Sequence, residues 1–193
     1  FASMSAGLTG SRTLAMQAAE QTAIRADRAK LGEPAMAFMQ LFVATPLLTQ
    51  VRFGQWDAIL AQAEPPAALP FPTAIWHFAR GMALARTGRA AEAGRELEAL
   101  RRIAHDPAMA NVVFGVNRAD SVLAVALPML QGELLRMQGK REQGIAAMRE
   151  ALPALERLPR FGADGEPVPG NGVLEEPEVR AAFVAWMEGR RDV

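Results

Sequence analysis

Residues 73–104 constrain the fold more than any other part of the chain. They contain two amphipathic helical patterns separated by a three-residue break, Thr87, Gly88 and Arg89. A break this short returns the second helix alongside the first, as in other helical hairpins with short connections. The sequence therefore predicts a helical hairpin, with Pro72 just before its first helix.

Composition favours helices in the rest of the 193-residue chain. Half of the residues are hydrophobic, but only 6% are aromatic and tyrosine is absent. Strands draw on aromatic and β-branched residues, whereas alanine and leucine, which supply much of the apolar content here, form helices readily. The length suits one domain with a substantial core or a stack of about five to seven helices, and we expect an all-α protein.

Further helical patterns lie on both sides of the hairpin, and glycine or proline separates them. Ser11 is placed to cap the helix that follows it, and Gly32 is placed to end that helix. Four prolines in residues 65–72 predict an extended connector instead of a helix. The expected helices outside the hairpin cover residues 12–30, 35–53, 57–64, 120–138, 142–158 and 175–189.

Parts of the chain depart from a regular helical pattern. Prolines inside expected helices, at positions 46, 128 and 153, remove a backbone donor and predict bends. Residues 109–118 are ambiguous between a short strand and an apolar loop packed against the helices. Residues 159–174 are rich in glycine and proline without periodicity, so we expect a linker or loop there.

Glycines at the turns recur with a regular spacing. Gly54 and Gly88 are 34 residues apart. Around Gly88, small residues stand seven positions before and five positions after, and a bulky residue stands nine positions after. The same pattern fits around Gly139 and, more weakly, around Gly10. The residues in these places are Gly81, Ala93 and Leu97 in the first set, Gly132, Gly144 and Met148 in the second, and Ser3, Ala15 and Ala19 in the third.

The small residues have a physical reason. Where the two helices of one hairpin cross, a side chain larger than alanine or serine pushes them apart, while the bulky residue fills the gap to the next hairpin. On these residues the chain resembles the tetratricopeptide-repeat (TPR) superfamily over residues 1–158. The resemblance implies TPR-like antiparallel helical hairpins stacked into an irregular right-handed α-solenoid.

The expected array is irregular because the chain departs from the family pattern. His77 and Pro128 stand where the family has a tryptophan in the first helix of the repeat. Gly88 and Gly139 are 51 residues apart, and Gly10 and Gly54 are 44 apart, so neither interval is one period. We therefore expect inserts between some of the hairpins.

Few residues are suited to catalysis or metal binding. The chain has no cysteine, and His77 and His105 have no metal-binding partner three or four residues away. No phosphate-binding or dinucleotide-binding motif is present. Glu133 precedes Arg136 by three positions, which is typical of a surface ion pair. We expect a protein that is not an enzyme and holds no metal or cofactor.

Net charge and hydropathy disfavour some classes of partner. The 21 basic and 21 acidic residues cancel, which disfavours nucleic-acid binding. No apolar run approaches the ~20 residues of a membrane span. The chain starts with phenylalanine, so we expect it to be part of a longer protein. The absence of cysteine suits either the cytoplasm or the periplasm, and a homo-oligomer is compatible with the sequence.

The family resemblance implies that the first helices of the hairpins form a face that holds a partner protein or peptide. Arginines recur near the ends of these mostly apolar helices, which suits an apolar peptide bearing a carboxylate. Alternatively, residues 107–117 or the last helix cover this face. The candidate partner-binding residues are Arg52, Ile75, Phe78, Met82, Arg86, Met129, Glu133 and Arg136, with Leu41, Ala44, Leu48, Val51, Ala85 and Met137 in the same register.

The sequence thus predicts a non-enzymatic interaction scaffold. One alternative is an accessory or dimerising domain of a larger enzyme or regulator. Another is a sensor of apolar small molecules, which requires a closed cavity on the order of several hundred Å³ between the first helices of neighbouring hairpins.

Overall fold

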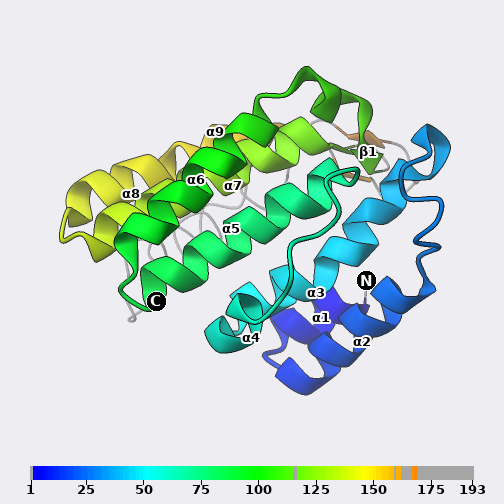
Figure 1. Ribbon diagram of the computed structural model, residues 1–193, viewed down its shortest axis with the longest axis horizontal. Coiled ribbons are helices and arrows are strands. Elements are labelled where there is room, and N and C mark those ends of the chain that lie inside the picture. Colours follow the sequence, from blue (N-terminus) through cyan, green and yellow to red (C-terminus); the bar gives the residue numbers. More distant parts are fainter. Residues whose placement is uncertain (1, 115–116, 159, 162–166, 169–193) are drawn as a thin grey trace.

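The computed structural model describes residues 2–114, 117–158, 160–161 and 167–168, which form a helical protein with two very small sheets (Figure 1). The all-α prediction is confirmed. The expected helix at 175–189 and most of the expected linker at 159–174 lie outside the described residues.

The α-helices are α1 (Ala2–Leu8), α2 (Arg12–Arg25), α3 (Gln40–Arg52), α4 (Trp56–Leu60), α5 (Pro70–Arg86), α6 (Ala90–Ala104), α7 (Ala119–Met137), α8 (Arg141–Arg149) and α9 (Ala151–Arg157). The 3-10 helices are η1 (Pro34–Met39) and η2 (Pro107–Asn111). Strand β1 (Val113–Phe114) pairs with β2 (Asn117–Arg118), and β3 (Arg160–Phe161) pairs with β4 (Pro167–Val168), both antiparallel.

Four turns join consecutive helices with the same geometry. Gly10, Gly54, Gly88 and Gly139 have φ of 76°, 64°, 81° and 80°. In each turn the residue after the glycine donates its backbone N–H to the carbonyl five positions earlier, as Arg89 does to Leu84 at 2.8 Å. This is the Schellman ending, which needs a left-handed residue and therefore favours glycine. The predicted turn glycines are confirmed.

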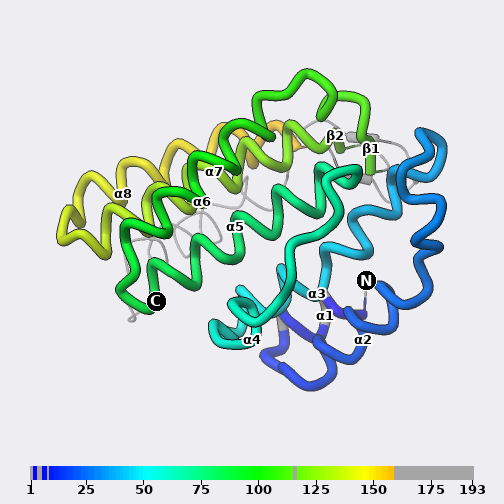
Figure 2. Tube along the Cα trace, in the orientation of Figure 1, coloured from blue at the N-terminus to red at the C-terminus, as the bar shows by residue number. Residues whose placement is uncertain are grey.

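Each hairpin also packs against its neighbours. Helix α3 contacts α2, α4 and α5, while α5 contacts α6 and α7, and α7 contacts α6, α8 and α9. Figure 2 shows this order as a continuous path of helices from the N-terminal end to α8. One hydrophobic core runs through α3, α5, α6 and α7, and its fully buried members include Phe71, Leu84, Leu100 and Leu123.

Glycines allow close helix contacts within one hairpin and between neighbouring hairpins. A Cβ on Gly132 would lie 2.6 Å from the backbone oxygen of Gly144, so α7 and α8 cross as expected for one hairpin. A Cβ on Gly81 would instead meet Leu130 of α7 at 2.6 Å. The next hairpin therefore requires a small residue at Gly81, and this contact was not predicted.

Several helix boundaries differ from the expected ones. Helix α2 ends at Arg25 and not near residue 30, because the Asp27 carboxylate accepts the backbone N–H of Ala29 at 3.1 Å and favours a local turn. Gly32 therefore does not cap α2. Ser11 occupies the N-cap position of α2, but its side chain caps no backbone N–H.

Three further differences occur at segments that contain proline. The predicted helix at 35–53 consists of η1, which starts at Pro34, followed by α3. Helix α5 starts at Pro70, inside the expected connector, because proline is well suited to the first turn of a helix. The predicted helix at 142–158 divides into α8 and α9 at Glu150, since Pro153 clashes with the carbonyl four residues before it.

The ambiguous segment at 109–118 contains both helix and strand. It comprises the end of η2 and the β1–β2 pair. The Phe114 ring lies 4.4 Å from the Phe71 ring, centroid to centroid, and both side chains are buried. This insert therefore covers the N-terminal end of α5.

One stretch of the described chain, Pro34–Arg52, is long and apolar enough to cross a membrane by length and composition, which corrects the expectation that no such run exists. Core helices of soluble proteins pass the same test. Gln40 and Gln50 of this stretch are buried, and they hydrogen-bond to Leu31 and Gln62 in other parts of the chain. Such contacts are typical of a helix in a packed core.

Candidate functional site

The C-terminal ends of α5 and α7 bring together three of the predicted site residues, which we call the arginine–glutamate cluster: Arg86, Glu133 and Arg136. Arg86 lies in the last turn of α5, and the other two lie near the end of α7. Arg86 Nε is 2.6 Å from Glu133 Oε1, and Arg136 Nε donates a hydrogen bond to Glu133 Oε2 at 3.2 Å. Stacking of neighbouring hairpins thus places two guanidinium groups on one carboxylate.

Burial in this cluster is uneven. The side chain of Glu133 is 2% exposed, whereas those of Arg86 and Arg136 are 42% and 23% exposed. The prediction of a surface pair between Glu133 and Arg136 was therefore wrong about the carboxylate. The cluster carries two positive charges and one buried negative charge, so its accessible part is positive.

Hydrogen bonding in the cluster is incomplete. Although Arg86 Nε is close to Glu133 Oε1, it is not aligned with it, and this buried oxygen accepts no hydrogen bond from the described residues. Each guanidinium has five N–H donors, and the described contacts of each arginine with Glu133 use Nε. Donors remain for a further anionic group.

The other candidate residues lie elsewhere or inside the core. Arg52 donates from Nε and Nη2 to the carbonyl of Gly7, at 3.1 and 2.9 Å, and so binds the C-terminal end of α1. Ile75 and Met82 are buried, at 1% and 8% exposed. Phe78 and Met129 are partly buried. Phe78 packs against the main core, and Met129 packs against Met148 and Leu152.

A second ionic cluster links α5 to α6. Glu96 accepts from Arg80 Nε at 3.1 Å, and its other oxygen lies 2.6 Å from His77 Nδ1. Burial of Glu96 has the largest single effect and raises its pKa. The hydrogen bonds and charges of His77 and Arg80 together outweigh burial, so the pKa of Glu96 lies below its usual value. His77, which the sequence left without a partner, therefore joins two helices of one hairpin.

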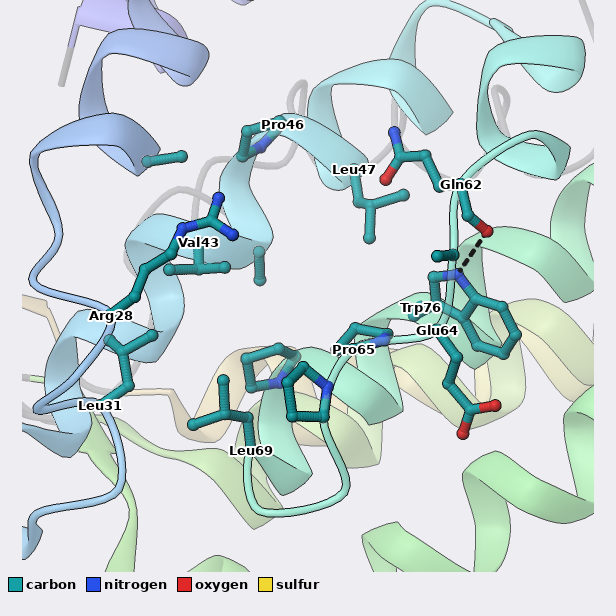
Figure 3. A pocket seen from close by; sticks show the side chains of 15 residues that line it. Arg28, Leu31, Val43, Pro46, Leu47, Gln62, Glu64, Pro65, Leu69 and Trp76 are labelled. Atoms are coloured by element: carbon teal, nitrogen blue, oxygen red, sulfur yellow. Dashed lines mark hydrogen bonds between the residues drawn. The ribbon is translucent and has the colours of Figure 1, made fainter.

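A pocket lies beside α3, between two first helices where one of the alternatives placed a cavity, but its lining residues were not predicted. The cavity has a volume of about 460 Å³ (Figure 3). Its walls are the end of α2 with the residues that follow it, helix α3, the segment between α4 and α5, and Trp76 of α5. Trp76 Nε1 donates to the carbonyl of Gln62 at 3.3 Å, which attaches the connector to α5. Helix α4 ends at Leu60, although the sequence predicted a helix up to residue 64, and the proline run begins only at Pro65.

Comparisons with protein-family models, with curated proteins and with solved structures found no match for this chain. Within the described residues, no three His, Cys, Asp or Glu side chains are grouped to hold a metal ion. The chemistry of the two sites, the arginine–glutamate cluster and the pocket, therefore carries the functional argument.

Proposed function

We propose that this chain is a TPR-like array, an irregular right-handed α-solenoid of antiparallel hairpins, that acts as a non-enzymatic scaffold for a partner peptide or protein. Four hairpin turns with one hydrogen-bond pattern support the repeat. So does the packing order, in which α5 contacts both its hairpin partner α6 and the first helices α3 and α7 of the adjacent hairpins.

The arginine–glutamate cluster is the observation that carries this proposal. A carboxylate of the partner binds to the free N–H donors of Arg86 and Arg136, because guanidinium groups pair strongly with carboxylates. The buried carboxylate of Glu133 holds both arginines in place before the partner arrives, which lowers the entropic cost of binding.

Apolar side chains on α5 and α7, the helices that carry the cluster, define the rest of the partner. Met137 is 43% exposed, and Phe78 and Met129 are partly buried on the same helices. Methionine adapts to the shape of apolar ligands. The expected partner is therefore an apolar peptide segment with a carboxylate, either at its C-terminus or on an acidic side chain.

Synthetic apolar peptides test the proposal, each made once with a free C-terminal carboxylate and once with a C-terminal amide. Fluorescence anisotropy with the purified protein should show binding of carboxylate forms that is at least about tenfold tighter than that of the amides. The variant Arg86→Gln should reduce this ratio, because it removes a charge while keeping polar bulk. Arg95→Gln, which changes a 72% exposed arginine on α6, is the matched control and should leave the ratio unchanged.

Two results would overturn the proposal. One is equal binding of carboxylate and amide peptides by the unaltered protein. The other is an equal loss of binding in the Arg86→Gln and Arg95→Gln variants, which would mean that only the overall charge matters.

A further inference from the structure

The second helix of the α3–α4 hairpin is unusually short. Helix α4 has five residues, whereas α6, which occupies the same place in the next hairpin, has 15. After α4 the chain continues without a helix until Pro70. The pocket lies along Val43 and Leu47 of α3, where further turns of α4 would otherwise pack. A truncated repeat therefore creates this cavity.

The cavity is suited to an apolar small molecule. Its volume of about 460 Å³ falls within the range of small-molecule sites, about 300–1,000 Å³. Apolar side chains line it except for Arg28, Gln62 and Glu64. Trp76 forms part of one wall and is held by its hydrogen bond to the connector.

Among the polar lining residues, only Arg28 offers an unused charge to the cavity. Gln62 Nε2 already donates to Gln50 at 2.7 Å. Figure 3 shows the Glu64 carboxylate directed away from the other lining side chains, and the Arg28 guanidinium directed towards the cavity beside Val43. Within the described residues, Arg28 takes part in no ion pair or hydrogen bond.

We propose that this pocket binds a small monocarboxylic acid with an apolar tail. The carboxylate pairs with Arg28, and the tail lies against Val43, Leu47 and Trp76. A single arginine suits one negative charge. A phosphate carries more charge and needs more donors than this pocket offers.

Calorimetric titration of the full chain tests this inference. The probes are octanoate, decanoate and phenylbutyrate, with octanol and octylamine as neutral and cationic matches. At least one acid should bind saturably with one site per chain, and octanol and octylamine should bind at least about tenfold more weakly.

Variants locate the site. Arg28→Gln should weaken binding of the acid by about tenfold or more. Arg25 is a nearby exposed arginine outside the cavity, so Arg25→Gln should leave binding of the acid unchanged. Val43→Trp fills the cavity and should abolish binding in a protein that still unfolds cooperatively. Arg86→Gln should leave acid binding unchanged, so this inference and the proposed peptide site succeed or fail separately.

The inference is overturned if none of the three acids binds saturably. It is also overturned if Arg28→Gln binds the acid as tightly as the unaltered protein, or if octanol binds as tightly as octanoate, because the carboxylate would then have no role.

Discussion

The close crossing of α7 and α8 predicts that Gly132→Ala destabilises the protein although alanine favours helices. In a free helix, replacing glycine by alanine stabilises by about 1 kcal/mol. Here the new Cβ would lie 2.6 Å from the Gly144 oxygen and 2.3 Å from Met148 Cγ. The methionine can move, but the backbone oxygen cannot unless the helices separate. Overpacking of this kind costs about 1–3 kcal/mol, so after the helix gain we expect a net loss of up to about 2 kcal/mol.

Two other glycines provide matched controls. Gly94 lies inside α6, and a Cβ there would meet nothing within 4 Å, so Gly94→Ala should stabilise by about 0.5–1 kcal/mol. Gly81→Ala should fall between the two variants, because the group it would meet is the flexible end of Leu130.

Urea unfolding followed by tryptophan fluorescence checks this order. With a slope of about 2 kcal/mol per molar urea, the unfolding midpoints of the Gly132 and Gly94 variants should differ by about 1 M. The reasoning is refuted if Gly132→Ala is as stable as Gly94→Ala, because the two helices would then not be in close contact.

Three further predictions concern a turn, a helix end and pH. Gly139→Ala should destabilise by about 1 kcal/mol in urea unfolding, because φ is 80° at this position; equal stability would contradict the turn geometry. Arg52→Ala should speed hydrogen exchange of α1, since its two hydrogen bonds to Gly7 are lost, and unchanged exchange would contradict that role. Glu96→Gln should lower stability at pH 7. Because the pKa of Glu96 is lowered in the folded protein, this deficit should shrink as pH falls below the usual value of 4.5, and a constant deficit would contradict the pairing.

The hairpin turns could be predicted because their cause is local. A Schellman ending needs a left-handed residue, so Gly88 and Gly139 mark helix ends regardless of what packs around them. The crossing at Gly132 and Gly144 follows from their spacing around one such turn. These local signals were enough to predict the hairpins that position the arginine–glutamate cluster.

The environment of Glu133 could not be predicted, because it depends on packing between hairpins. Its neighbour in sequence, Arg136, indicates only a surface pair, whereas Arg86 reaches it from α5. The pocket likewise depends on packing between segments that are distant in the sequence. Leu31, Val43 and Trp76 come from three separate segments, and nothing in their spacing indicates that they line one cavity.

Hydrogen exchange of the protein with and without its tightest-binding carboxylate peptide tests the central claim most directly. The account predicts slower exchange in the last turns of α5 and α7, around Arg86 and Arg136, and no change in α2. Protection confined to other helices, or no protection at saturating peptide, would contradict the claim that the arginine–glutamate cluster is the partner-binding site.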